Sequence, residues 1–205
     1  MKKPSEIIND PVKATLFGKF YEKIISRWLK ECKEFKVLDG KPRVYWKDVE
    51  PAKVNSEGAR RLKTTLEKYK KEKYYCTPDG LLEKHGRYYI WEAKNWPFWT
   101  EGKKPIDQLR DVLFSMPLVL APKAVHRGKE YEVHGILFSW WSKPDGIESL
   151  LEEINGLIAP RTFEIVYTDE LLEDCIKNKY QWYVEIIMKE KQRIDEFWRG
   201  LLGEP

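Results

Sequence analysis

The sequence is poor in cysteine, methionine and glutamine, with three residues of each in 205. The three cysteines are scattered, cannot all pair and match no metal-binding pattern, which argues against a disulfide scaffold and favours a reducing cytoplasm. No run of eighteen apolar residues occurs, so no conventional membrane-spanning helix is expected. The start, Met1 to Glu6, lacks the apolar stretch of a signal peptide. We therefore expect a cytoplasmic protein with no membrane partner.

Charge is plentiful but unevenly divided along the chain. Residues 1–75 carry 20 Lys and Arg against 11 Asp and Glu, whereas residues 76–205 carry 17 against 22. A basic half joined to an acidic half suits a phosphate-rich partner, although a well-solvated surface explains the charge equally well. The abundance of Lys and Glu favours a thermophilic source. The length suits one domain over residues 1–205.

The most informative segment is residues 76–94. Cys76-Thr77-Pro78-Asp79-Gly80 is followed by an apolar hairpin that ends in Tyr88-Tyr89-Ile90-Trp91-Glu92-Ala93-Lys94. Successive side chains of a strand point to opposite faces, so Glu92 and Lys94 share a face and Ala93 lies opposite. The hairpin, with its apex at His85-Gly86, brings Asp79 close to both. Carboxylates in this arrangement suit a hard divalent cation, and a neighbouring lysine can orient or deprotonate water.

Pro78-Asp79, twelve intervening residues and then Glu92-Ala93-Lys94 resembles the motif of the PD-(D/E)XK nuclease superfamily, which has the restriction-endonuclease-like fold. The resemblance implies hydrolysis of DNA phosphodiester bonds with Mg²⁺, for which Mn²⁺ substitutes. It implies that Asp79, Glu92 and the backbone carbonyl of Ala93 bind metal and that Lys94 acts on the attacking water. The alternative is a surface hairpin with an incidental ion pair.

Two flanking helices add candidate residues. The first is expected from residue 9 to about residue 29, and Gly18 to Glu22 matches the Gly-x-x-x-Glu that many superfamily members carry on a helix near the metal. Glu22 is thus a candidate catalytic residue and metal ligand, or else a helix residue paired with a nearby lysine. A helix opened by Pro105 carries Gln108, which resembles a catalytic residue of the exonuclease-like branches, although Val112 stands where they have tyrosine.

Basic and aromatic side chains are candidates for contact with nucleic acid. A helix expected from Ser56 to about Lys73 has a basic face that could follow a phosphate backbone or simply be solvated. The loop after Lys94 could stack bases and contact phosphate, or pack as a lid on the core. These candidates are Arg60, Arg61, Lys70, Lys71, Trp96, Trp99, Lys103 and Lys104.

The order of expected elements predicts an α/β protein with a mixed central sheet flanked by helices, which agrees with the fold that the resemblance implies. Its core would cover about residues 11–140, followed by a C-terminal helical elaboration over about 145–205. The alternatives to a DNA nuclease are a Holliday-junction or structure-specific resolvase and a DNA-binding protein that no longer cleaves. The aromatic-rich last helix, expected over residues 179–202, predicts a homodimer seam or a cover for the sheet.

Overall fold

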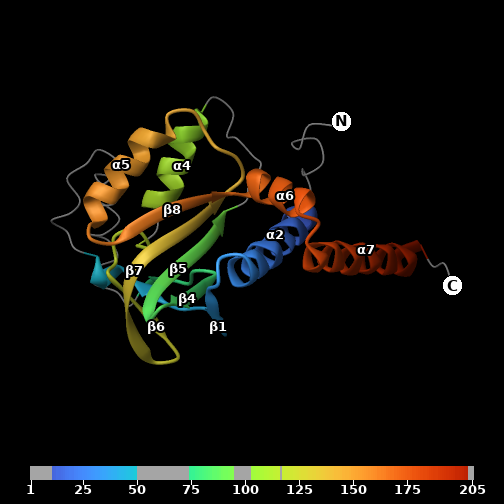
Figure 1. Ribbon diagram of the computed structural model, residues 1–205, viewed down its shortest axis with the longest axis horizontal. Coiled ribbons are helices and arrows are strands. Elements are labelled where there is room, and N and C mark those ends of the chain that lie inside the picture. The colour runs from blue at the N-terminus through green and yellow to red at the C-terminus, as the bar shows by residue number, and fades with distance from the viewer. Residues whose placement is uncertain (1–10, 50–73, 95–102, 116, 203–205) are drawn as a thin grey trace.

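A computed structural model of the chain describes residues 11–49, 74–94, 103–115 and 117–202. In these ranges six strands form one mixed sheet, and a further pair of short strands lies beside it (Figure 1). The strands of the sheet are β1 (Lys36–Leu38), β4 (Gly80–Lys84), β5 (Arg87–Lys94), β6 (Lys123–His126), β7 (Lys129–Trp140) and β8 (Thr162–Tyr167). The predicted α/β class with a mixed sheet is confirmed.

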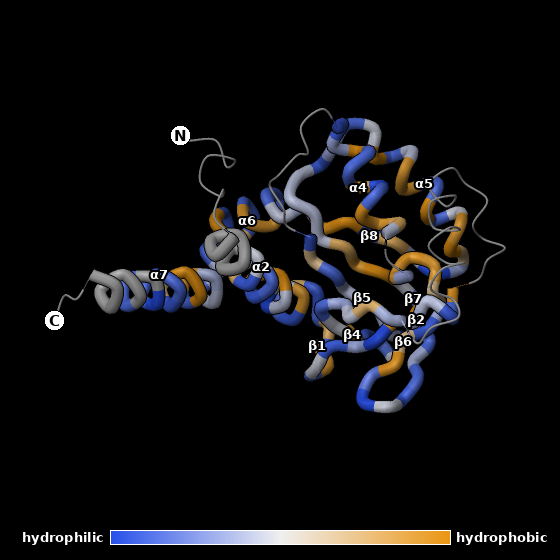
Figure 2. The backbone as a smooth tube through the Cα atoms, turned by 180° about the vertical axis from the view of Figure 1, so that it is seen from behind, coloured by the Kyte–Doolittle hydropathy of each residue, from blue (hydrophilic) through white to orange (hydrophobic). Residues whose placement is uncertain are grey.

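The centre of the sheet is parallel and its margins are antiparallel. β7 runs parallel to β5 on one side and to β8 on the other, while β1, β4 and β5 form consecutive antiparallel pairs. The start of β7 also pairs with β6 in an antiparallel hairpin. Parallel strands need covered faces, and β7 is buried throughout its second half. Figure 2 shows the apolar character of these inner strands beside the hydrophilic tip of the β6–β7 hairpin.

Helices cover both faces of the sheet, as the strand alternation requires. The helices are α2 (Pro11–Glu31), α4 (Pro105–Phe114), α5 (Ile147–Ile158), α6 (Thr168–Lys177) and α7 (Gln181–Leu202). Ile90 points into a large core shared with α4 and α5, whereas the next residue, Trp91, points into a second core shared with α2 and α6. The C-terminal part of the chain is therefore integral to the fold, since β8 and two of its helices complete both layers.

The predicted hairpin over residues 80–94 is confirmed. β4 and β5 pair from Lys84 opposite Arg87 to Gly80 opposite Trp91. The two turn residues, His85 and Gly86, have φ angles of 52° and 74°. Positive φ at both central positions is the geometry that two-residue hairpins favour, because its twist matches that of the strands. The register places Asp79, just before β4, beside the end of β5.

In the sequence, Asp39-Gly40 between two short apolar segments also predicts a hairpin turn, and this prediction is wrong. β1 pairs with β4, whereas β2 (Val44–Tyr45) pairs with β3 (Tyr75–Cys76) outside the main sheet and leads into a short 3₁₀ helix, Trp46–Asp48. β1 and β2 are too short to form a stable hairpin with each other, and each pairs with a strand that is distant in sequence. Residues 39–42 consequently form a crossing loop between two sheets.

The other expected helices that fall within the described residues are present, with shifted ends. The first is described from Pro11, the helix opened by Pro105 ends at Phe114, and the last begins at Gln181. Ser56 to Lys73 lies outside the described residues. Within the described residues, no helix has both the length and the apolarity needed to cross a membrane.

Candidate metal and catalytic site

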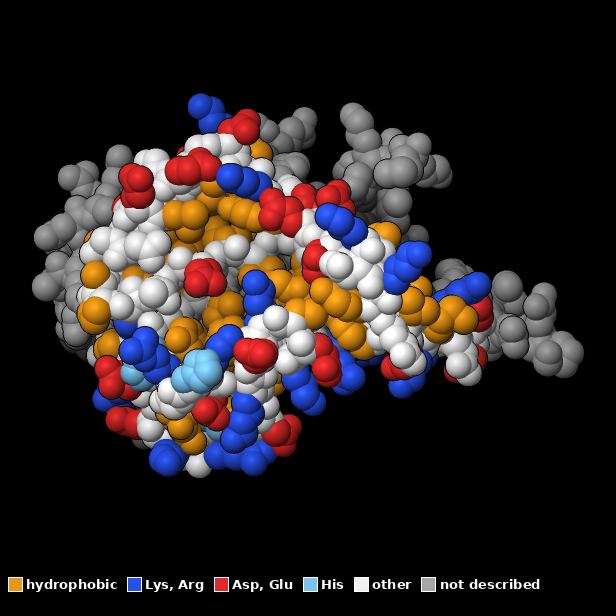
Figure 3. All heavy atoms as spheres, viewed as in Figure 1, with side chains coloured by type: hydrophobic (Ala, Val, Ile, Leu, Met, Phe, Trp, Pro, Cys, Tyr) orange, Lys and Arg blue, Asp and Glu red, His pale blue; other side chains and the backbone are white. Residues whose placement is uncertain are grey.

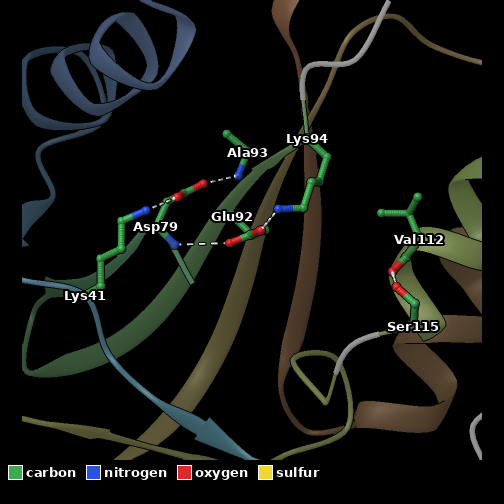
Figure 4. A network of polar contacts seen from close by, with 7 residues as sticks. All are labelled: Lys41, Asp79, Glu92, Ala93, Lys94, Val112 and Ser115. Atoms are coloured by element: carbon green, nitrogen blue, oxygen red, sulfur yellow. Dashed lines mark hydrogen bonds and ion pairs between the residues drawn. The ribbon is translucent and has the colours of Figure 1, made fainter. Parts of the chain in front are cut away.

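Asp79 and Glu92 meet where β4 begins and β5 nears its end. The backbone N–H of Asp79 donates a 3.1 Å hydrogen bond to Oε2 of Glu92. In return, the backbone N–H of Ala93 donates a 2.9 Å hydrogen bond to Oδ2 of Asp79. Figure 4 shows the two carboxylates side by side between the strands. The predicted convergence of these two acids is therefore observed, and it follows directly from the hairpin register.

Lys94 completes the group on the same side of β5. Its Nζ atom forms an ion pair with Oε1 of Glu92, which confirms that the two side chains share a face. The Glu92 side chain is only 5% exposed, while that of Lys94 is 32% exposed. The carboxylate thus lies at the base of the site, and the ammonium group lies nearer to solvent, where it could reach a water molecule or a substrate.

The two acids repel each other electrostatically. Burial, and secondly the charge of Asp79, raise the pKa of Glu92 above its ordinary value, and the ion pair with Lys94 and the Asp79 N–H offset only part of that effect. A buried pair of carboxylates is unfavourable unless a positive charge compensates it. The arrangement therefore favours the binding of a cation.

Glu22 contributes to the same electrostatic cluster from α2. Burial, and then the charge of Asp79, raise the pKa of Glu22, while Lys41 and Lys94 lower it more than Lys19 on its own helix does. Its strongest electrostatic partners are thus site residues and not the neighbouring helix lysine. These effects place the charge of Glu22 near the site, although among the described residues no third acid joins Asp79 and Glu92 as a metal ligand.

Lys41 is a site residue that the sequence did not reveal. Its Nζ atom donates a 2.6 Å hydrogen bond to Oδ1 of Asp79, from the loop between β1 and β2 (Figure 4). The Asp79 side chain is 8% exposed and that of Lys41 is 52% exposed. Burial lowers the pKa of Lys41, but the bond to Asp79 and the charges of the acids outweigh burial and raise it. Lys41 follows an apparent hairpin turn, so no local pattern signals its contact with residue 79.

The other predicted residues are placed less centrally. Gln108 lies in α4, which packs on the sheet face that carries Ile90, and Val112 one turn later is partly buried in that core. Lys103 forms an ion pair with Asp111, so its charge is already engaged. Lys104 is exposed just before α4. The remaining nucleic-acid candidates, Arg60, Arg61, Lys70, Lys71, Trp96 and Trp99, lie outside the described residues.

The donor set for a metal is small. Among the described residues, no three His, Cys, Asp or Glu side chains are placed together to hold a metal ion. The donors that the structure offers are the carboxylates of Asp79 and Glu92, and hard oxygen donors of this kind fit Mg²⁺. Magnesium commonly keeps several water ligands, so two carboxylates suffice for a site that also binds phosphate. The acids could hold a cation, and Lys94 could orient water beside it.

No protein family, curated protein or solved structure matches this chain.

Proposed function

We propose that the chain is a Mg²⁺-dependent nuclease of the restriction-endonuclease-like type that hydrolyses phosphodiester bonds of DNA. The observation that carries this proposal is the meeting of Asp79, Glu92 and Lys94 at the end of one hairpin. The two acids are joined through reciprocal backbone hydrogen bonds, and the lysine is paired with the more deeply buried acid. An incidental surface ion pair would need neither the burial of both acids nor their exact placement side by side.

Each side chain has a role that its position supports. Asp79 and Glu92 would hold the cation, with the Ala93 carbonyl as a further donor and Glu22 behind them on α2. A bound Mg²⁺ ion would neutralise charge on the scissile phosphate and lower the pKa of a bound water. Lys94 would orient that water, or accept its proton when the side chain is a neutral amine, because the Lys94 side chain is partly exposed beside Glu92.

The architecture also supports the proposal. The chain places a helix, antiparallel strands, the motif hairpin, a helix and a parallel strand in the order that the resemblance implies. The C-terminal β8 and the last three helices go beyond that resemblance. DNA as substrate rests on the excess of positive charge in residues 1–75. The face shown in Figure 3 mixes basic and acidic side chains, so it offers no single positive track.

The test is incubation of the purified protein with labelled linear, circular, single-stranded and branched DNA, in Mg²⁺, in Mn²⁺ and in a chelator. We expect cleavage that needs the metal and disappears in Asp79→Asn, because an amide lacks the charge that a hard cation requires. Glu83→Gln is the matched control, since Glu83 lies on the same hairpin and pairs with Lys36.

The panel also separates the alternatives. Cleavage restricted to branched DNA would identify a structure-specific resolvase. DNA binding without cleavage in either metal, together with no measurable affinity for Mn²⁺, would contradict the proposal and leave a binding protein on a nuclease-like scaffold.

A further inference from the structure

Lys41 places a positive charge of the protein's own where the proposed site would hold its metal. Its ammonium group is 2.6 Å from Oδ1 of Asp79. The charges of Glu22 and Glu92 also act on it. Lys41 is therefore in contact with Asp79 and within the electrostatic influence of the other two acids. Figure 4 shows this side chain reaching Asp79 from the side opposite to Lys94.

The backbone that carries Lys41 is anchored at both ends. Nε2 of the buried His126 lies 3.0 Å from the carbonyl oxygen of Asp39, and Arg127 pairs with the Asp39 carboxylate. On the other side, Arg43 exchanges two backbone hydrogen bonds of 2.7 and 2.8 Å with Val125. The loop is thus fastened to the β6–β7 hairpin, while the Lys41 side chain extends from it on a flexible stem.

The two oxygens of Asp79 have different partners. Oδ2 accepts the N–H of Ala93, a backbone group that cannot leave, whereas Oδ1 accepts the ammonium group of Lys41. Oδ1 is therefore the oxygen that a metal ion would take, and Lys41 already holds it. A divalent ion and an ammonium group repel each other at such short range, so only one of them can occupy this position.

We propose that Lys41 is an exchangeable internal cation, which neutralises Asp79 in the metal-free protein and must leave this carboxylate before a divalent ion binds. It thereby sets the ion concentration at which the site fills. This inference rests on the proposed function, since it assigns a regulatory role to a residue of that same site. Lys41 is a positioning residue in this scheme and takes no part in bond cleavage.

An ordinary surface ion pair would not behave in this way. The pair between Arg127 and Asp39 has side chains that are 67% and 93% exposed, so water replaces either partner at little cost. Asp79 is 8% exposed, so its charge needs a replacement when the lysine leaves. A divalent ion supplies that replacement, which an exposed pair such as Arg127–Asp39 would not need.

Calorimetric titration with Mn²⁺ tests the exchange directly, in the absence of DNA. Lys41→Met removes the competing charge and should bind Mn²⁺ about thirtyfold more tightly than the wild type, which is the Coulomb effect of a unit charge next to a divalent ion under aqueous screening. Lys41→Arg keeps the charge and should bind like the wild type. Lys36→Met is the matched control, because Lys36 pairs with Glu83 instead.

Thermal unfolding gives a second readout. Without metal, Lys41→Met should unfold at a lower temperature than the wild type, because Asp79 loses its partner, and Mn²⁺ should restore more stability to the variant than to the wild type. Lys41→Gln serves the same purpose if the methionine variant does not fold.

The outcomes distinguish this inference from the proposed function. Equal or weaker Mn²⁺ affinity in Lys41→Met, with a wild type that binds Mn²⁺ and cleaves DNA, overturns the exchange and leaves the nuclease standing. A wild type that binds no Mn²⁺ at all overturns both.

Discussion

At the scale of single residues, the ionised carboxylate of Glu92 is in an unfavourable environment in the candidate site. It is buried, it lies beside a second carboxylate, and its ion pair with Lys94 does not fully compensate it. Functional sites commonly carry such unfavourable groups, because the charge that destabilises the free protein binds the ligand. Removing the charge while keeping the shape should therefore stabilise the fold and abolish the proposed function.

We predict that Glu92→Gln raises the free energy of unfolding at neutral pH, in a chelating buffer, by on the order of 1 kcal/mol. The gain should shrink as the pH falls. The folded wild type, whose Glu92 pKa is raised, binds a proton before the unfolded chain does at its ordinary value of 4.5, so its stability increases as the pH falls through that window. Urea denaturation over this range measures both effects.

Glu83→Gln provides the comparison, because that acid pairs with Lys36 at the far end of the hairpin and should show no such gain. A Glu92→Gln variant that is less stable than the wild type at neutral pH would mean that the Glu92–Lys94 pair stabilises the fold, contrary to our account.

At the scale of elements, the β4–β5 hairpin positions the Asp79 and Glu92 carboxylates, and a comparison of Gly80 in this hairpin with Gly18 in α2 illustrates it. A Cβ atom on Gly80 would overlap the indole ring of Trp91 across the strand pair, whereas a Cβ atom on Gly18 in α2 would meet nothing within 4 Å. Gly80 also follows Asp79 directly. The close approach of β4 to β5 at this position is thus what brings the two carboxylates together.

We predict opposite effects for these two glycines. Gly80→Ala should cost about 1–3 kcal/mol of stability, as overpacking of a tight site does, and should weaken Mn²⁺ binding by moving Asp79 away from Ala93. Gly18→Ala should gain about 0.5–1 kcal/mol, because alanine stiffens a helix, and should leave Mn²⁺ affinity unchanged. Denaturation and calorimetry on the two variants check this. Normal Mn²⁺ affinity in Gly80→Ala would show that the hairpin register does not position the site.

The separation in sequence between site residues explains which of them the sequence could predict. Asp79, Glu92 and Lys94 lie within one hairpin, so strand alternation and a two-residue turn suffice to place them. Lys41 reaches Asp79 from 38 residues away, and its loop is set by strands that pair with distant segments. The residues Asp39-Gly40 favour a local hairpin turn, but β1 and β2 pair with distant strands instead. The hydrophobic periodicity of the sequence does not indicate which strands pair over such distances.

At the scale of the whole molecule, α7 extends away from the sheet (Figure 1). Its first turns are fastened to the body, because Trp182, Tyr183 and Ile186 pack against the core and Glu190 pairs with Lys23 of α2. These three apolar residues therefore pack within the protomer, so the predicted dimer seam would have to use other apolar residues that remain exposed. Ile187 is partly buried, and the side chains of Ile194 and Trp198 are outside the described residues.

Other apolar residues near the start of α7 are exposed. Ile176 of α6 and Val184 and Met188 of α7 are 62%, 52% and 60% exposed, and Figure 3 shows apolar side chains along this part of the molecule. We predict that the wild type is a dimer at micromolar concentration and that Val184→Glu with Met188→Glu shifts it to a monomer. Light scattering measures the mass, and Gln181→Glu with Gln192→Glu is the control with the same charge change. A monomeric wild type would remove the dimer and favour a nickase or an exonuclease.

We propose that Asp79, Glu92 and Lys94 form a metal-dependent hydrolytic site, and one comparison tests this proposal most directly. Wild type and Lys94→Ala are incubated at equal concentration with labelled DNA and Mg²⁺, and the rate of phosphodiester cleavage is measured. We expect cleavage by the wild type and a loss of at least about a hundredfold in Lys94→Ala, as expected for removal of a general acid–base group, with DNA binding retained. Equal rates for the two proteins, or no cleavage by the wild type of any DNA form, would contradict it.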